Sequence, residues 1–299
     1  MNVHSIMTDV VLAFVAGTTL AQQPGPATPP RVPEGTIIHR DLAYVTNGHE
    51  RQKLDLYLPK ADKDLPLIIW VHGGAWLAGS KERPVPLTYL ADGYAVASIN
   101  YRLSQHAVFP AQIEDCKAAV RWLRGHAAQY HLDPNHFAAW GESAGGHLVA
   151  MLGTTGDTKV FDVGENLSTS SRVQAVLDFF GPTDLVQMDA HRLLNGEVHD
   201  TADSPESRLV GGPIQENKDK VAKANPITYV SKDDPPFLIV HGDADPVVTH
   251  HQSELLEAAL KQAGVPVTFY TVKGGGHGGF RDPNVPVITR QFLARRLKP

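Results

Sequence analysis

A serine flanked by glycines lies where a predicted strand is followed by a predicted helix. Ser143 is the centre of the pattern Gly-x-Ser-x-Gly at residues 141–145, after the apolar residues 137–140. A serine on so sharp a turn has a strained backbone, which is tolerated only where its neighbours are small. The pattern predicts an exposed nucleophilic hydroxyl, with the amide of Ala144 facing a developing oxyanion. An ordinary strand-to-helix turn would give the same pattern, so other residues must decide.

A histidine in a glycine-rich loop is the candidate base for this hydroxyl, which reacts well only when its proton is removed. The chain has 15 histidines. His277 differs from the others because it follows a predicted strand and has five glycine neighbours within residues 274–279. Such a loop could reach across the site. A solvent-exposed histidine in a flexible loop is the alternative interpretation.

Two aspartates compete to orient that histidine, because a carboxylate must fix its tautomer and stabilise the imidazolium. Asp243 and Asp245 lie in one loop, directly after another predicted buried strand. Their spacing does not choose between them. Either one gives the chain order serine, acid, histidine, which is associated with one fold and is not the order of chymotrypsin-like or subtilisin-like chains.

A second glycine-rich loop follows another apolar strand and supplies candidate amide donors. Its small residues Gly73, Gly74 and Ala75 let backbone amides approach a ligand oxygen closely. Together with the amide of Ala144 they form the candidate oxyanion hole, and a turn chosen for flexibility is the alternative. We expect His72, at the start of this loop, to be a buried structural histidine that hydrogen-bonds the loop.

Two side chains next to these backbone groups are candidate substrate contacts. Trp76 directly follows the second loop and would line the acyl or alcohol side of the site. A tryptophan packed in the core is equally consistent with the sequence. Glu142 precedes the serine, where the alternative role is to anchor the turn.

The predicted strands place all of these candidates at one edge of a sheet. Strand and helix patterns alternate along the chain, which predicts an α/β fold with a mostly parallel sheet and helices on both faces. Functional groups gather at the carboxyl ends of strands in such sheets. The expected strands are residues 36–45, 52–58, 67–71, 94–99, 137–140, 173–180, 236–240 and 265–272. The expected helices are residues 110–130, 147–152, 250–263 and 285–297.

Two segments depart from this alternation. Residues 182–229 are polar with short apolar stretches, and predict a small helical, lid-like insertion within one domain that spans residues 36–299. At the N-terminus, an apolar run followed by small residues predicts a signal peptide at 1–21, and the Pro-rich residues 22–35 predict a disordered leader. The expected location is secreted or periplasmic. Because no Lys or Arg precedes the apolar run, a cytoplasmic protein is the alternative.

Composition argues against several other classes of function. The chain has 42% hydrophobic residues, 20% charged residues and a net charge of -5, an ordinary soluble composition with no basic run for nucleic acid. No apolar run is long enough to cross a bilayer. Cys116 is the single cysteine, which excludes an internal disulfide. We expect no metal and no cofactor, because neither His-Glu-x-x-His nor Cys-x-x-Cys spacing occurs.

These motifs resemble those of α/β-hydrolase esterases over nearly the whole chain after the predicted leader. They are similar to hormone-sensitive-lipase-like carboxylesterases, and more so to the bacterial BD-FAE branch, which includes feruloyl and acetyl-xylan esterases. The stretches that carry the resemblance are residues 72–74, 100–103, 109–111, 115–123, 141–146, 204–207, 241–245 and 276–278. The resemblance gives the acid role to Asp245 and a loop-shaping role to Asp243. The sequence differs from the lipase-like relatives at Ala75, where they carry a third glycine. The backbone amide of Ala75 can still donate, but its methyl group narrows the pocket.

The resemblance implies a serine carboxylesterase that hydrolyses short-chain acyl or aryl esters through Ser143, His277 and Asp245. An acetyl-xylan or feruloyl esterase acting on plant polysaccharide esters is the alternative. A peptidase of the prolyl-oligopeptidase kind is less consistent, because such relatives carry a large propeller domain. A non-catalytic binding protein is also less consistent, because such proteins commonly lose a catalytic residue. The expected partner is thus a small-molecule or polysaccharide-linked ester, and the oligomeric state stays open.

Overall fold

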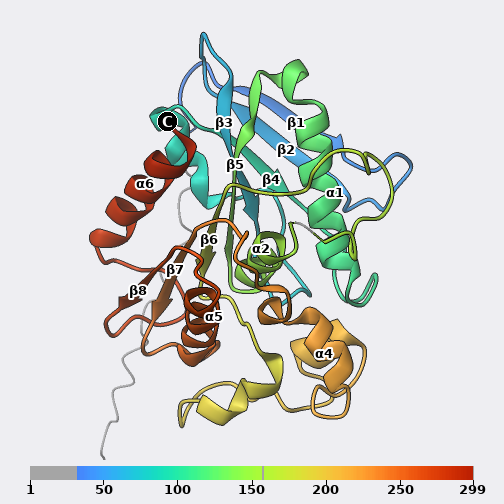
Figure 1. Cartoon of the computed structure of the whole chain (residues 1–299), viewed down its shortest axis with the longest axis vertical. Coiled ribbons are helices and arrows are strands. Elements are labelled where there is room, and N and C mark those ends of the chain that lie inside the picture. Colours follow the sequence, from blue (N-terminus) through green and yellow to red (C-terminus); the bar gives the residue numbers. More distant parts are fainter. Residues whose placement is uncertain (1–31, 157, 299) are drawn as a thin grey trace, which may run out of the picture.

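An eight-stranded sheet runs through the centre of the structure, a computed structural model that describes residues 32–156 and 158–298 (Figure 1). The strand order is β1-β2-β4-β3-β5-β6-β7-β8. Strand β2 pairs antiparallel with β1 and with β4, and all further neighbours are parallel. The sequence predicted this mostly parallel sheet.

The strands agree with the predicted ones to within a few residues, except that β5 begins earlier. They are β1 (Ile37–Ala43), β2 (Lys53–Leu58), β3 (Leu65–Val71), β4 (Ala95–Ile99), β5 (Leu132–Glu142), β6 (Ala175–Phe179), β7 (Phe237–Gly242) and β8 (Val267–Val272). The early start of β5 follows from pairing of Leu132 with Leu65 of β3. Strands β3 and β4 are buried throughout, whereas the edge strand β1 is largely exposed.

Helices cover both faces of the sheet, and each face has its own apolar core. One core joins the sheet to α1 (Ala111–Gly125), α2 (Ala144–Thr154) and α5 (His251–Gln262). The other joins it to α6 (Asn284–Leu297) and the 3-10 helix η1 (Val85–Asp92). Alternate side chains of β3 enter opposite cores, as the strand period requires: Ile69 packs in the first and Trp70 in the second. A short 3-10 helix, η2 (Ala127–Tyr130), completes the segment predicted as one helix.

The insertion between β6 and β7 consists of short helices, as the sequence predicted. They are η3 (Leu185–Gln187), η4 (Asp189–His191), α3 (Pro205–Val210), α4 (Lys218–Ala224) and η5 (Pro226–Tyr229). Ser204 caps α3, its hydroxyl accepting a hydrogen bond from the Ser207 amide. Several hydrogen bonds tie the insertion to the rest of the fold, including one to the segment before α1 and one to α2. The Phe109 amide donates to the Leu209 carbonyl (2.8 Å), and His147 Nε2 donates to the Ala224 carbonyl (2.6 Å).

The N-terminal boundary differs from the predicted one. The predicted signal peptide and leader residues 22–31 lie outside the described residues. Residues 32–35, predicted as the end of the disordered leader, are instead ordered: both the amide and the hydroxyl of Thr36 donate to the Pro33 carbonyl. Val32 packs against a small apolar cluster that includes Tyr57 and Leu90, which sequence periodicity did not reveal. Across the described chain, no helix is long and apolar enough to span a membrane.

Candidate active site

Ser143 occupies a strained turn between β5 and α2. Its backbone has φ 53° and ψ -123°, and its amide donates to the Phe179 carbonyl (2.9 Å). Both flanking glycines are required because the backbone leaves no room for a Cβ atom at either position. A Cβ on Gly141 would lie 2.2 Å from the Gly145 carbonyl oxygen, and a Cβ on Gly145 would lie 2.1 Å from that of Val71. The turn therefore has the geometry of a nucleophile elbow.

A line of hydrogen bonds connects this serine to a histidine and an aspartate. The distance from Ser143 Oγ to His277 Nε2 is 2.9 Å, and from His277 Nδ1 to Asp245 Oδ2 it is 2.7 Å. When the imidazole carries its proton on Nδ1, that N–H donates a hydrogen bond to the carboxylate. The unprotonated Nε2 can then accept a hydrogen bond from the serine hydroxyl. The three residues come from the ends of three different strands, as a catalytic site in a parallel sheet requires.

The Asp245 carboxylate is buried and held by donors on both oxygens. The amides of Val247 (2.8 Å) and Val248 (3.0 Å) donate to Oδ1, while His277 and His241 approach Oδ2. Burial alone would raise the pKa of this carboxyl, but the hydrogen bonds from His241 and His277 outweigh it and hold the pKa well below its usual range. Asp245 is thus ionised and able to fix the His277 tautomer.

Asp243, the competing acid, faces away from this line. Its carboxylate accepts a hydrogen bond from the Gly274 amide (2.6 Å) and lies 3.8 Å from the Lys273 ammonium. It therefore anchors one end of the glycine-rich loop that carries His277. The two aspartates that sequence spacing could not separate are separated by the direction of their side chains.

His241 is a buried histidine of the site for which no catalytic role was predicted from the sequence. Its Nε2 lies 3.2 Å from Asp245 Oδ2 and 2.9 Å from the Val248 carbonyl, so a proton on Nε2 is shared between them. Its Nδ1 accepts from the Ser253 hydroxyl (2.7 Å). The signal in the sequence was its position near the end of the predicted strand, four residues before Asp245. The direction of its ring depends on the tertiary fold.

The second glycine-rich loop lies against the elbow. A Cβ on Gly73 would lie 3.3 Å from Ser143 Cβ, so the two segments touch. Gly74 and Ala75 have positive φ values of 111° and 54°. Their amides and that of Ala144 donate to no described residue and stay available beside the serine.

His72 fixes this loop from behind, and its predicted structural role is confirmed. The ring is buried, its Nδ1 donates to the Gly73 carbonyl (2.7 Å), and its Nε2 accepts from Arg51 (3.1 Å). Burial lowers the pKa of His72 to about 4, so the ring is neutral at ordinary pH.

The structure corrects one of the two predicted substrate contacts. Trp76 is only 1% exposed and packs edge-on against His147, with ring centroids 5.3 Å apart. The left-handed backbone at Ala75 and Trp76 directs the indole into the core, so the interpretation as a core tryptophan is the one that holds. Its side chain does not reach the groove at Ser143.

Glu142, the other predicted contact, does line that groove. The partly buried carboxyl group makes no hydrogen bond or ion pair with any described residue. Burial raises the pKa of Glu142 to about 7, an effect that the nearby His277 reduces. A carboxyl group near half-ionisation beside the nucleophile can donate or accept a hydrogen bond from a substrate.

The groove has a volume of about 460 Å³ and includes residues that the sequence did not predict. The ring of Phe180, directly after β6, meets the His277 ring edge-on at 4.8 Å. Glu197 and Val247 form part of the rim, Glu197 from the insertion, where its amide donates to the Pro246 carbonyl (2.7 Å). An apolar cavity of about 320 Å³ adjoins the groove through Glu142, Phe180 and Gly279.

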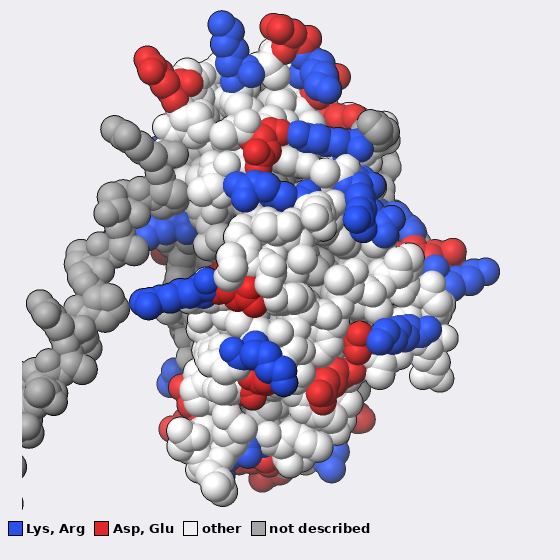
Figure 2. Space-filling model, turned by 90° about the vertical axis from the view of Figure 1, so that its left-hand side faces the viewer, with Lys and Arg blue, Asp and Glu red and all other residues white. Residues whose placement is uncertain are grey.

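Possible metal ligands and surface charge were compared over the residues that the structure describes. Within residues 32–156 and 158–298, no group of three His, Cys, Asp or Glu side chains is placed to hold a metal ion. The adjacent His250 and His251 both contact Glu254 instead. On the face shown in Figure 2, basic and acidic side chains of the described residues are interspersed, without an extended patch of one sign.

Known proteins share this fold and much of the sequence. LipM of Mycobacterium tuberculosis, a probable carboxylic ester hydrolase, is 31% identical over 294 residues, which cover 93% of this chain and 66% of LipM. A truncated carbohydrate esterase from gut microbiota is 37% identical with a TM-score of 0.80, covering 88% of this chain and 97% of that one. A bifunctional GH43-CE protein of Bacteroides eggerthii is 38% identical with a TM-score of 0.79, covering 87% of this chain and 38% of that one.

The extent of these matches places the chain in a family. It spans 66%, 56% and 64% of the lengths of three curated mycobacterial relatives. The family model BD-FAE matches residues 54–260, more than half of the chain. The chain therefore belongs to the BD-FAE family and has the α/β-hydrolase fold.

Proposed function

We propose that the chain is a serine carboxylesterase that hydrolyses short-chain acyl or aryl esters at Ser143. The observation that carries this proposal is the continuous line of hydrogen bonds from Ser143 through His277 to Asp245. Ser143 Oγ attacks the ester carbonyl carbon while His277 Nε2 takes the hydroxyl proton, and Asp245 stabilises the resulting imidazolium. The C–O bond to the alcohol then breaks, and the alcohol leaves with the proton from His277.

The second half of the reaction releases the acid. Water gives a proton to His277 and attacks the acyl-enzyme, and the proton returns to Ser143 when the acid departs. In both halves a negative charge develops on the former carbonyl oxygen. The amides of Gly74, Ala75 and Ala144, with Gly73 holding the loop against Ser143, form the proposed oxyanion hole.

The groove suits an acyl group on one side and an alcohol on the other. The adjoining apolar cavity, lined by Tyr89, Trp140, Phe179 and Phe280, is proposed to take the acyl or aryl group. The insertion at residues 182–229 brings Glu197 to the rim of the groove. We therefore propose that the insertion acts as a lid over the alcohol group. Residues 1–21 are proposed as an export signal on sequence grounds alone.

Polysaccharide esters are the second candidate substrates. The solved structures named above include a carbohydrate esterase and a GH43-CE protein. The carboxyl groups of Glu142 and Glu197 line the groove and have no partner among the described residues. Carboxylates are strong acceptors for the hydroxyl groups of a sugar.

The test is hydrolysis of p-nitrophenyl acetate, butyrate and octanoate, with methyl ferulate and acetylated xylan alongside, by the native chain and Ser143→Ala. We expect the variant to lose at least about 10³-fold in kcat. A steep fall beyond acetate together with xylan turnover favours the polysaccharide candidate. Equal activity in both chains would overturn the proposal. Turnover of an aminoacyl anilide would instead indicate a peptidase.

A further inference from the structure

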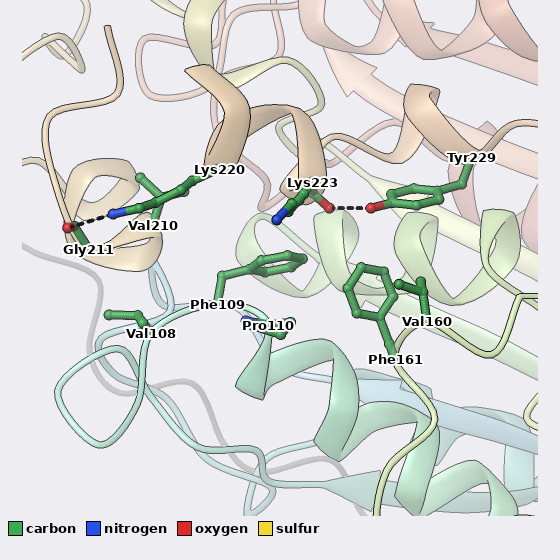
Figure 3. A pocket seen from close by; sticks show the side chains of 10 residues that line it. All are labelled: Val108, Phe109, Pro110, Val160, Phe161, Val210, Gly211, Lys220, Lys223 and Tyr229. Carbon is green, nitrogen blue, oxygen red and sulfur yellow. Dashed lines mark hydrogen bonds between the residues drawn. The ribbon is translucent and has the colours of Figure 1, made fainter. Parts of the chain in front are cut away.

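A second, larger cavity lies between the start of α1 and the helical insertion (Figure 3). Its volume is about 650 Å³, in the range of pockets that hold small molecules, and it shares no lining residue with the groove at Ser143. Its lining residues are Val108, Phe109, Pro110, Val160, Phe161, Val210, Gly211, Lys220, Lys223 and Tyr229. The proposed ester hydrolysis does not use it.

The walls of this cavity are apolar and aromatic. Phe161 packs edge-on against both Phe109 and Tyr229, with ring centroids 5.6 Å apart in each pair. The Tyr229 hydroxyl donates to the Lys223 carbonyl (2.9 Å), so the polar end of this ring is already satisfied. Val108 and Val160 are 47% and 60% exposed at the opening. Contact with an apolar molecule would remove this surface from water.

Two ammonium groups border the same cavity without a counter-charge. Lys220 Nζ donates only to the Gly211 carbonyl, at 3.4 Å, and Lys223 Nζ makes no hydrogen bond or ion pair with a described residue. Figure 3 shows the Lys223 ammonium pointing from α4 toward Phe109. No Asp or Glu is among the lining residues. Positive charge beside an apolar wall complements a molecule with one anionic end and an apolar body.

We propose that this cavity binds an amphipathic monocarboxylate, such as a medium-chain fatty acid. The carboxylate accepts hydrogen bonds from Lys223 and Lys220, and the apolar chain lies over Phe109 and Phe161. The ligand contacts both the loop before α1 and helix α4 of the insertion, so its binding stabilises the insertion against the sheet domain. The acid can be one released at Ser143 or one taken from the surroundings, since the recognised chemistry is the same. The site itself does not depend on the proposed function.

The test is calorimetric titration of the full chain with octanoate and with octylammonium. Before the titration, Ser143 is labelled with a fluorophosphonate, so that octanoate cannot bind in the groove at Ser143. If the reagent does not label Ser143, the titration uses Ser143→Ala instead. We expect octanoate to bind and octylammonium not to bind. Lys223→Met should weaken octanoate binding about tenfold, as expected for a lost hydrogen bond to a charged group. The double variant Lys220→Glu/Lys223→Glu should reverse the preference, so that octylammonium binds and octanoate does not.

The matched control is Lys218→Glu, an exposed lysine of the same helix that does not line the cavity. It should leave octanoate affinity unchanged, which excludes a general effect of net charge. Unchanged octanoate affinity in the double variant, or equal binding of the two ligands by the native chain, would overturn the proposal. The proposal would also be overturned if octanoate bound to neither chain and the native chain self-associated in a way that the double variant abolished. Octanoate released by turnover of p-nitrophenyl octanoate on the native chain should bind with the same affinity as octanoate added to Ser143→Ala, because the cavity recognises the acid from either source.

Discussion

The last residue of β5, Glu142, and the loop after β7, through Asp245, each place a carboxyl group near His277. The pKa of Glu142 is raised above its usual value, whereas that of Asp245 is lowered. Burial favours the neutral form of both carboxyl groups and acts to raise both pKa values, but at Asp245 the hydrogen bonds outweigh it. Asp245 accepts hydrogen bonds from two amides and two imidazoles, whereas Glu142 accepts none from a described residue. The comparison shows that the donors around a carboxyl group, rather than its burial, decide whether it serves as a fixed anion or as a titrating group.

The largest effect should come from replacing the fixed anion. In Asp245→Asn the side-chain amide can present a donor to His277 and favours the wrong tautomer, so kcat should fall by about 10⁴-fold. Asp243→Asn is the matched control in the same loop, because its carboxylate holds Gly274 and not His277. Steady-state hydrolysis of p-nitrophenyl acetate measures both. Similar losses in the two variants would contradict the assignment of Asp245.

Removing one donor to that anion should have a smaller effect. His241→Leu deletes the imidazole that approaches Asp245 Oδ2, and kcat should fall by about tenfold, as for a lost hydrogen bond to a charged group. The pKa of Asp245 should rise toward its usual range, so activity on the acid side of the pH profile should be lost at a higher pH than in the native chain. His241→Gln, whose amide can donate, should recover part of both. A uniform loss at every pH would mean that His241 acts only in packing.

The titrating group should act on stability rather than on catalysis. The pKa of Glu142 is about 7 in the fold and about 4.3 in an unfolded chain, so the folded state binds the proton more tightly. Its favourable contribution is complete below about pH 4 and is lost as the pH rises through 7. Between pH 4 and pH 8, the unfolding free energy of the native chain should therefore fall by about 1 to 3 kcal/mol more than that of Glu142→Gln. Urea unfolding at the two pH values measures this, and an unchanged pH dependence would contradict it.

The opposite sign is expected for Asp245, whose folded pKa is depressed. Its contribution is present above the unfolded value, about pH 4, and is lost as the pH falls further. Below pH 4, the unfolding free energy of Asp245→Asn should therefore fall less than that of the native chain.

The smallest effect concerns the rim of the groove. Glu197→Gln removes a carboxylate that a sugar hydroxyl could reach, and KM for acetylated xylan fragments should rise about threefold, as for one hydrogen bond at the surface. Hydrolysis of p-nitrophenyl acetate, which has no sugar, is the control reaction and should not change. Equal changes with both substrates would remove Glu197 from the account of specificity.

The sequence predicted the parts of the site that depend on local structure. Ser143, His277 and the glycine-rich loop at residues 73–75 each directly follow a strand whose apolar run is visible in the sequence. The strand order then brings these strand ends together at one edge of the sheet. Fold class and strand positions were predictable for the same reason, since periodicity reports burial on one or both faces.

Other parts depend on contacts between distant segments and could not be read from spacing. The direction of Trp76 into the core follows from a left-handed backbone at two non-glycine residues, which the sequence does not signal. Glu197 reaches the groove only because the insertion folds back onto the loop that carries Asp245. The spacing of Asp243 and Asp245 could not choose between them either. The resemblance favoured Asp245, and the side-chain directions in the structure agree with that choice.

We propose Ser143 as the nucleophile, activated through His277 and Asp245. The most direct measurement is labelling of the full chain with a fluorophosphonate, followed by peptide mass spectrometry, for the native chain, Ser143→Ala and Asp245→Asn. We expect a single label on Ser143 in the native chain, none in Ser143→Ala, and labelling at least about 100-fold slower in Asp245→Asn. A label on another residue, or equal labelling of Ser143→Ala, would contradict it.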